Sequence, residues 1–344
     1  MYKRKEMYMG SSEDKSQKIL LYSGMLKLVN KSGVGQAVRH QKQALEQAGV
    51  PFTMDKKDDY DVVHINTIFP DSFIMSKCAK RKGKKVVYHA HSTMEDFRNS
   101  FIGSNLFAPL FKRWITHCYN SGDVIITPTE YSKDLLKSYG LKPPIVSLSN
   151  GIDTEFFKKT TEARERFRKK YNLSDDKKVI ISVGHYIKRK GILDFIELAK
   201  RMPEYEFFWF GYTNLNMIQP KIRKAITKAP ANLHFPGYVN RSEIRDAYCG
   251  SDLFLFLTYE ETEGIVLLEA LAAKIPVLVR DIPIYSKLKD GEVVYKANRL
   301  EDFHRKIVKI IKGDLPDITE NGYKIAKERD LKVIGKRLKE IYQY

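Results

Sequence analysis

Short apolar runs alternate with amphipathic stretches along most of the chain. Turn residues bound the runs, and residues 35–49 (GQAVRHQKQALEQAG) have the spacing of an amphipathic helix. Because parallel strands are joined by crossover helices, this alternation predicts an α/β fold with parallel sheets covered by helices. We expect strands within residues 18–23, 61–67, 85–92, 123–128, 144–150, 178–185, 206–211, 232–237, 252–258, 275–280 and 292–297.

Turn residues break this rhythm in residues 149–157 (SNGIDTEFF), and the rhythm restarts at residue 178. The break predicts two Rossmann-like domains in series, residues 18–152 and 153–325. Residues 1–17 are polar and lack the apolar core of a signal peptide, so we expect a flexible leader. Ligands bind outside the carboxyl ends of the strands in such sheets, which makes the cleft between the domains the expected site.

The formal net charge of +18 favours polyanionic partners such as phosphorylated ligands, anionic lipid or nucleic acid. Basic residues gather in residues 76–85 and 158–178, whereas a charge that served only solubility would be spread evenly. No nucleic-acid motif or aromatic stacking platform accompanies them, so we expect no nucleic-acid partner.

The cysteines Cys78, Cys118 and Cys249 have no paired spacing. A disulfide framework and a zinc site are therefore not expected, and a reducing cytosol is the default compartment. No apolar run approaches the length of a membrane-spanning helix.

Two glycines follow the first expected strand in residues 31–38 (KSGVGQAV). Gly33 and Gly35 let the backbone approach a ligand, and the start of the following helix favours anions. A third glycine and a ribose-binding acid are missing, so the segment makes a weak dinucleotide fingerprint. A tight turn without a ligand is the alternative.

The third strand ends in HAHSTMEDF (residues 89–97). We expect His89 and His91 to point to opposite faces, one buried in the sheet and the other, His91, facing the cleft. A histidine at a strand end is a candidate for function, although a lone histidine is more often structural. Glu95 and Asp96 follow, where they would orient a sugar or His91.

The first strand of the second domain ends in SVGHYIKRKG (residues 182–191). Gly184 and His185 lie at the end of this strand. They are followed by the basic residues Lys188, Arg189 and Lys190. Cations at this place would face a phosphate bound in the cleft. A solvated basic loop is the alternative.

The segment DLFLFLTYEETEGIVLLEALAAKIPVLVR (residues 252–280) has the pattern of a βαβ unit. Its helix would start at Gly264, where the amides of Gly264, Ile265 and Val266 form a cradle for a diphosphate. Glu269 stands in the apolar run of this helix, where a carboxylate is best explained as an acceptor for hydroxyl groups such as those of a ribose. Glu261, on the loop, would accept from a sugar in the same way.

Taken together and in this order, these features resemble the GT-B retaining glycosyltransferases of family 4. The resemblance covers nearly the whole chain from Lys18 and rests on the glycine-rich first loop, the segment VGHYIKRKG and the E-x7-E pair Glu261 and Glu269. Two departures concern the donor sugar: His185 stands where the family usually has Arg, and Thr262–Glu263 replace a Gly-Phe pair, which adds a charge near the donor.

The resemblance implies a role for each candidate residue. Glu269 would bind the ribose of a nucleotide-sugar, Glu261 the donor sugar, and Lys190 the diphosphate, with Arg189 compensating for His185. His91 would touch the reacting sugar, and Gly33 and Gly35 would close over the donor from the first domain. The second domain would thus bind the nucleotide-sugar, and residues 326–344 would form a helix that crosses back to the first domain. The family implies retention of configuration, no bound metal and no cofactor beyond the donor.

A narrower resemblance lies in residues 91–114 (HSTMEDFRNSFIGSNLFAPLFKRW), which look like bacterial glycosyl-diacylglycerol synthases, above all the galactosyl-glucosyl-diacylglycerol synthases. This segment combines apolar and basic side chains, as a segment at an anionic membrane surface does. An ordinary core helix with a basic outer face is the alternative. The residues expected at the acceptor and membrane are Phe101, Phe107, Phe111, Lys112, Arg113 and Trp114.

These features predict a transferase that moves galactose or glucose from a UDP-sugar to a membrane glycolipid, in particular glucosyl-diacylglycerol. The alternatives are a glucosyltransferase acting on diacylglycerol itself, a transferase of cell-surface polysaccharide synthesis, and a non-enzymatic basic binding protein, which would have no use for Glu269 or Lys190. The expected location is the cytoplasm, at the inner face of the cell membrane, without an obligate protein partner.

Overall fold

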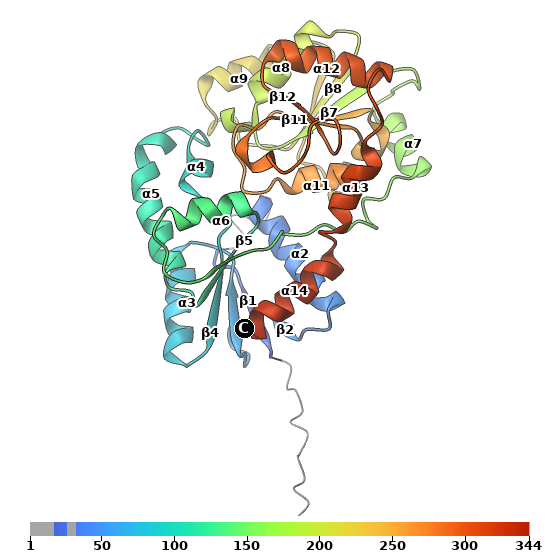
Figure 1. Cartoon of the computed structure of the whole chain (residues 1–344). Helices are drawn as coiled ribbons and strands as arrows, with labels where there is room; N and C mark the ends of the chain where they lie inside the picture. Colours follow the sequence, from blue (N-terminus) through green and yellow to red (C-terminus); the bar gives the residue numbers. More distant parts are fainter. Residues whose placement is uncertain (1–16, 26–31, 344) are drawn as a thin grey trace, which may run out of the picture.

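The computed structural model describes residues 17–25 and 32–343, which form two six-stranded sheets with every strand pair parallel (Figure 1). The first sheet has the order β2 (Phe52–Thr53), β1 (Ile19–Tyr22), β3 (Val62–Ile65), β4 (Lys85–His89), β5 (Val124–Thr127), β6 (Ile145–Ser147). The second has the order β12 (Tyr295–Ala297), β11 (Val277–Arg280), β10 (Leu253–Phe256), β7 (Val179–Val183), β8 (Glu206–Phe210), β9 (Leu233–Gly237).

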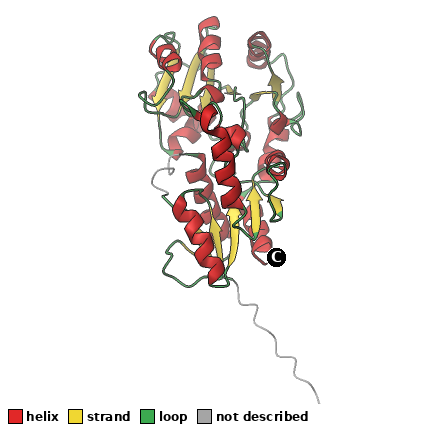
Figure 2. Ribbon diagram, turned by 90° about the vertical axis from the view of Figure 1, so that its left-hand side faces the viewer, coloured by secondary structure: helices red, strands yellow, loops and turns green. Residues whose placement is uncertain are grey.

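Helices flank both sheets, which lie one beyond the other along the molecule (Figure 2). The first domain contains α2 (Gly33–Gln47), α3 (Pro70–Arg81), α4 (Met94–Phe97), α5 (Ser104–Tyr119) and α6 (Glu130–Lys137). The second contains α7 (Thr161–Lys170), the 3₁₀ turn η1 (Lys188–Lys190), α8 (Ile192–Arg201), α9 (Pro220–Thr227), α10 (Arg241–Gly250), α11 (Ile265–Ala272), the 3₁₀ turn η2 (Pro283–Tyr285), α12 (Leu300–Lys312) and α13 (Thr319–Lys327). The chain ends in α14 (Leu331–Gln343).

The expected α/β fold with parallel sheets is confirmed, and each expected strand segment contains an observed strand. The segments were recognisable because strands of a parallel sheet are covered on both faces and therefore form continuous apolar runs. In β10, for example, all four residues are buried. Strand β2 was not expected, because its two residues are too few to form a pattern.

The C-terminal helix α14 lies on the first domain, against α2 (Figure 1). The two helices approach so closely that a Cβ on Gly335 would lie 2.2 Å from the carbonyl oxygen of Ala44. The Nζ of Lys85 donates to the carbonyl oxygens of Ile341 and Tyr342, both at 3.0 Å, and so fixes the end of α14. Among the described residues, no helix has both the length and the hydropathy to cross a bilayer.

Candidate active site

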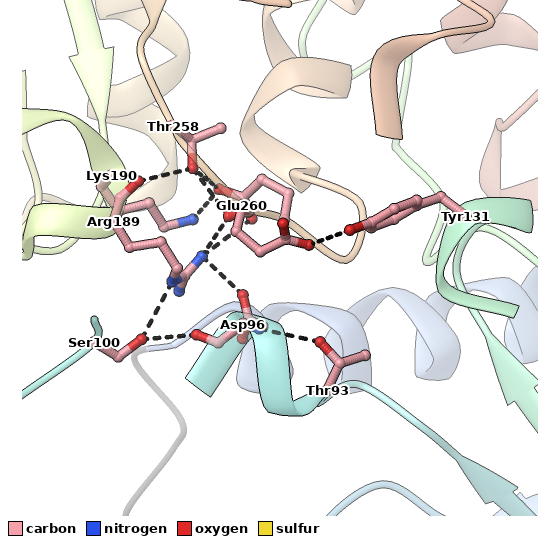
Figure 3. Close-up of polar contacts among 9 residues, drawn as sticks. Thr93, Asp96, Ser100, Tyr131, Arg189, Lys190, Thr258 and Glu260 are labelled. Carbon is pink, nitrogen blue, oxygen red and sulfur yellow. Dashed lines mark hydrogen bonds and ion pairs between the residues drawn. The ribbon is translucent and has the colours of Figure 1, made fainter. Parts of the chain in front are cut away.

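The loop after β10 lies at the junction of the two domains and is held by hydrogen bonds from the first domain. The Thr129 hydroxyl donates to the carbonyl oxygen of Thr262 at 2.9 Å. The Tyr131 hydroxyl donates to Oε1 of Glu260, also at 2.9 Å, as Figure 3 shows. Both donors follow β5, so the carboxyl end of the first sheet faces the loop that follows a strand of the second. This is where doubly wound sheets bind their ligands.

Glu261 and Lys190, two of the expected site residues, form a buried ion pair. The Nζ of Lys190 donates to Oε1 of Glu261, which also accepts from the Thr258 hydroxyl at 2.9 Å. The side chains of Lys190 and Glu261 are 14% and 6% exposed. Burial alone would raise the pKa of Glu261, but the charges of Lys190 and Arg189 and the hydrogen bonds outweigh it and lower the pKa. Glu261 is therefore an ionised carboxylate, and it holds Lys190 in place.

Arg189 connects the domains instead of standing free beside the pair. Its Nη1 lies 2.7 Å from Oδ1 of Asp96 and donates to the carbonyl oxygen of Glu260 at 2.7 Å, and its Nε donates to the Ser100 hydroxyl at 3.2 Å (Figure 3). Asp96, in α4, was expected beside a sugar or His91 but binds Arg189. Burial raises the pKa of Asp96, and the Arg189 charge opposes the rise.

Replacing Asp96 by asparagine is expected to lower the free energy of unfolding by about 1–3 kcal/mol, because the buried Arg189 guanidinium then loses the nearer of its carboxylate partners, Asp96 and Glu261. Urea denaturation of the full chain measures the change. Asp134→Asn is the matched control, since Asp134 is 70% exposed in its pair with Lys137 and should contribute little. Equal stability of the two variants would contradict the bridging role of Asp96.

Glu269 lies in α11 with 6% of its surface exposed. The Tyr248 hydroxyl donates to its Oε2 at 3.0 Å. Burial raises the pKa of Glu269 to about 7, although the hydrogen bond from Tyr248 and the charges of Arg241 and Arg39 act in the opposite direction. The carboxyl group therefore titrates near neutral pH, where it can accept hydrogen bonds from ligand hydroxyls when ionised.

Gly264 immediately precedes α11 with a φ of +82°, which an L side chain rarely adopts. A Cβ at this position would lie 3.0 Å from both the Phe256 ring and the Tyr285 hydroxyl. The amides of Ile265 and Val266, in the first turn, have no carbonyl partner four residues back within the helix, so they are available to an anion.

Glu263, the acid in the place of the usual aromatic residue, is turned toward the segment between the domains. Its Oε2 accepts from the backbone amide of Asn150 at 3.0 Å and from Asn150 Nδ2 at 2.8 Å. Its carboxyl group is buried, which raises its pKa. Glu263 thus ties the loop to Asn150.

The remaining expected donor residues stand at the starts of helices and the ends of strands. Gly184 follows β7, and its carbonyl oxygen accepts from Trp209 Nε1 at 2.8 Å. The Nδ1 of His185 donates to the carbonyl oxygen of Tyr212 at 3.0 Å, and burial lowers the pKa of His185, so the ring is neutral. Gly33 begins α2 in open space, and Gly35 is buried in its first turn.

His89 and His91 share one face, and the expectation that they point to opposite faces is wrong. Their rings stack with centroids 4.0 Å apart and 9° between the ring planes. Residues two apart along an extended chain point the same way, which is the physical reason. The Nε2 of His91 lies 3.0 Å from Oδ1 of Asn66, a residue that no pattern in the sequence had singled out.

The segment expected at the acceptor and membrane divides into an exposed and a packed part. The exposed part, here called the α5 apolar face, comprises Phe101, Ile102, Leu106, Phe107 and Leu110, which are 43–79% exposed. In the packed part, the Phe111 ring stacks on Phe97 at 4.0 Å and Trp114 Nε1 donates to the carbonyl oxygen of Ile68 at 2.7 Å. Lys112 lies 4.3 Å from the centroid of the Tyr139 ring, and Arg113 follows it in α5.

Two family profiles match most of this chain. Residues 49–156 match Glycosyltransferase Family 4, and residues 163–329 match Glycosyl transferases group 1. A processive diacylglycerol alpha-glucosyltransferase of Acholeplasma laidlawii is 44% identical over 95% of this chain and 98% of its own length. An alpha-galactosylglucosyldiacylglycerol synthase of Streptococcus pneumoniae is 27% identical over 84% of this chain and 79% of its own.

Solved structures share the fold. Anabaena Alr3699/HepE in complex with UDP-glucose superposes with a TM-score of 0.78, over 95% of this chain and 99% of that chain, at 16% identity. Sucrose-phosphate synthase from Thermosynechococcus elongatus superposes with a TM-score of 0.76 over 95% of this chain and 98% of that chain, at 13% identity. The expected GT-B architecture is confirmed.

Proposed function

The chain belongs to the family 4, group 1 glycosyltransferases, and we propose that it moves a hexose from a UDP-sugar to glucosyl-diacylglycerol in a membrane. The observation that carries this proposal is the 44% identity, over almost the whole chain, to a relative named a diacylglycerol alpha-glucosyltransferase. The same name favours glucose as the hexose. It also favours a second candidate acceptor, diacylglycerol itself, because the relative is called processive.

In the proposed complex, the donor lies at the junction between the domains. Glu269 accepts hydrogen bonds from the ribose hydroxyls, and the amides at the start of α11 bind the diphosphate. Lys190 releases Glu261 and turns to the diphosphate, while Glu261 accepts from the sugar hydroxyls. His91 contacts the reacting sugar from the first domain. The ion pair between Lys190 and Glu261 supports this arrangement, because it holds both side chains together at the domain junction.

The departing UDP carries the negative charge that develops during transfer. Lys190, once it has turned from Glu261, and the amides at the start of α11 stabilise this charge, and we assign them the task that a metal performs elsewhere. UDP-hexoses hold their sugar through an α linkage, and the two glycolipid-forming relatives described above are named as alpha enzymes. Retention of configuration is therefore part of the proposal.

The acceptor is reached at the membrane surface through the α5 apolar face. The centroid of the Phe73 ring in α3 lies 5.9 Å from that of Trp114 and 4.7 Å from that of His117, both in α5, so the two helices are neighbours. Helix α3 carries the exposed Ile74, and the Nζ of its Lys77 lies 5.3 Å from the centroid of the Phe73 ring. Apolar side chains beside basic ones suit the interface of an anionic bilayer, and we place the protein at the inner face of the cell membrane.

Binding to vesicles is expected to rise with the content of anionic lipid and to fall with added salt. Replacing both Leu106 and Leu110 by aspartate should weaken binding at least tenfold, because each buried leucine contributes about 1.5–3 kcal/mol. Vesicle co-sedimentation measures this. Val333→Asp, at an exposed position of α14, is the control. Unchanged binding of the double variant would exclude the α5 apolar face as the membrane contact.

The test of the function is a product assay with the full chain. UDP-glucose and UDP-galactose are each offered with diacylglycerol and with glucosyl-diacylglycerol in mixed vesicles, and the products are analysed by mass spectrometry and anomeric NMR. The proposal predicts an α-linked hexose on one or both lipids. Absence of transfer from either donor to either lipid would exclude it and would leave the polysaccharide-transferase and binding-protein alternatives.

A further inference from the structure

A chain of buried polar side chains runs from the C-terminal helix to His91. It starts at Tyr342 in α14, passes through His64 in β3 and His89 in β4, and reaches Gln41 in α2 and Asn66 after β3. Each of these side chains is at most 2% exposed. Apart from the proposed contact of His91 with the sugar, the transfer reaction described above makes no use of them.

With the amides of Gln41 and Asn66 oriented as in the structure, the hydrogen bonds determine which atoms carry protons. Gln41 Nε2 lies 2.7 Å from Asn66 Oδ1 and 2.8 Å from His89 Nδ1. An amide nitrogen only donates, so both of these atoms accept. His89 Nδ1 therefore carries no proton.

The order of donors continues in both directions. On one side, His64 Nε2 lies 3.2 Å from His89 Nδ1 and makes a weaker, second contact to the electron pair that already accepts from Gln41. With its proton on Nε2, His64 accepts at Nδ1 from the Tyr342 hydroxyl at 2.6 Å. On the other side, Asn66 Oδ1 accepts from His91 Nε2 at 3.0 Å. A neutral imidazole has one N–H, so the Nδ1 of His91 presents its electron pair.

Stability alone does not account for this chain. Gln41 Oε1, Asn66 Nδ2 and His89 Nε2 are buried and have no hydrogen-bond partner within residues 17–25 and 32–343. Burying polar atoms without partners is unfavourable, and apolar side chains of similar size would avoid the cost. Such an arrangement is expected where a functional group must be oriented.

We infer that Asn66, oriented by Gln41, is a positioning residue that holds His91 as the tautomer with the proton on Nε2, so that Nδ1 accepts a hydrogen bond from a hydroxyl of the transferred hexose. This inference rests on the proposed function, in which His91 touches the reacting sugar. The inference adds that Nδ1 of His91 makes this contact and that Asn66 and Gln41 select this nitrogen. The reverse order, with both amides turned over, would put the proton on Nδ1 and reverse the role of His91 from acceptor to donor.

Long-range ¹H–¹⁵N NMR of the full chain, labelled with ¹⁵N-histidine, measures the tautomer directly, and the spectrum of His91→Ala assigns the signals of His91. We expect the proton on Nε2 in the natural chain and in Asn66→Asp, which keeps the accepting oxygen. Asn66→Ala should show a mixture of the two tautomers. A proton on Nδ1 in the natural chain overturns the inference, whether or not any variant folds.

A double-mutant cycle tests the link to the reaction. Asn66→Ala should lower kcat about tenfold, the loss expected for one hydrogen bond that acts in the transition state, with little change in the KM for the donor. In the His91→Ala background the same replacement should have no further effect, because Asn66 acts through His91. An equal loss in both backgrounds overturns the inference. Full turnover of His91→Ala would instead refute the role of His91 in the proposed function, and the tautomer measurement distinguishes the two failures.

Discussion

Replacing Glu269 by alanine is expected to weaken the binding of UDP about a hundredfold. A ribose offers two hydroxyls, and each hydrogen bond to a charged acceptor contributes about 1.5–3 kcal/mol, so the loss of both amounts to about 3–6 kcal/mol, of which the lower end corresponds to about a hundredfold in affinity. The effect should be specific to the nucleotide, because Glu269 lies inside α11 and Tyr248 orients its carboxyl group at 3.0 Å. Isothermal titration calorimetry with UDP measures the change.

The pH dependence of the same interaction provides a second measurement. The pKa of Glu269 is raised from 4.5 to about 7, so the free protein holds this proton below pH 7 and releases it above. Only the ionised carboxylate accepts hydrogen bonds from both ribose hydroxyls. Because its population rises about tenfold between pH 6 and pH 8, the affinity for the nucleotide should rise by the same factor. By the same linkage, the contribution of Glu269 to stability is present below pH 4.5 and is lost as the pH rises through 7. UDP-glucose is the probe, because its diphosphate does not titrate in this range.

Two variants serve as controls for Glu269. Glu269→Gln keeps the shape of the side chain and should abolish the rise in affinity with pH. Glu320→Ala removes an exposed carboxylate that pairs with Lys274, and it should leave UDP binding unchanged. If Glu269→Ala bound UDP as tightly as the natural chain, the ribose would have to be held elsewhere.

The sequence sufficed for the features that depend on neighbours along the chain. Strands such as β7 and β10 appear as continuous apolar runs, because both faces of their sheet are covered. The carboxylate of Glu269 stood out for a similar reason, since it interrupts an apolar helix only eight positions after Glu261. Both features belong to a single βαβ unit, whose geometry is local.

What the sequence could not provide are partners that only the tertiary fold brings together. Arg189 and Asp96 meet across the domain junction, although 93 positions separate them. His64 and Tyr342 are 278 positions apart, and no periodicity links them. Lys190 was expected at a phosphate, but the charge that faces it in the structure is Glu261. Residue types thus indicated the chemistry of the site, whereas the pairings required coordinates.

The buried pair of Lys190 and Glu261 leads to the second large effect. Replacing Lys190 by methionine should lower turnover about 10²–10³-fold, the range found when one group that stabilises transition-state charge is removed. It should also lower the free energy of unfolding by about 3–5 kcal/mol, because Glu261 is left charged and buried. Nη1 of Arg189 lies 3.8 Å from Oε2 of Glu261 and partly balances its charge. We therefore expect the loss in unfolding free energy to lie at the lower end of this range. Turnover of UDP-glucose and urea denaturation measure the two effects.

The double variant Lys190→Met with Glu261→Gln separates stability from catalysis. It removes both charges, keeps the volume of both side chains, and leaves an amide oxygen at position 261 to accept from the Thr258 hydroxyl, which now donates to Glu261 at 2.9 Å. Stability should therefore return to within about 1 kcal/mol of the natural chain, because neutral replacement of a buried pair is well tolerated. Turnover should stay low, since the lysine assigned to the diphosphate is missing. If stability and turnover both recovered in the double variant, Lys190 would only neutralise Glu261 and would take no part in the transfer.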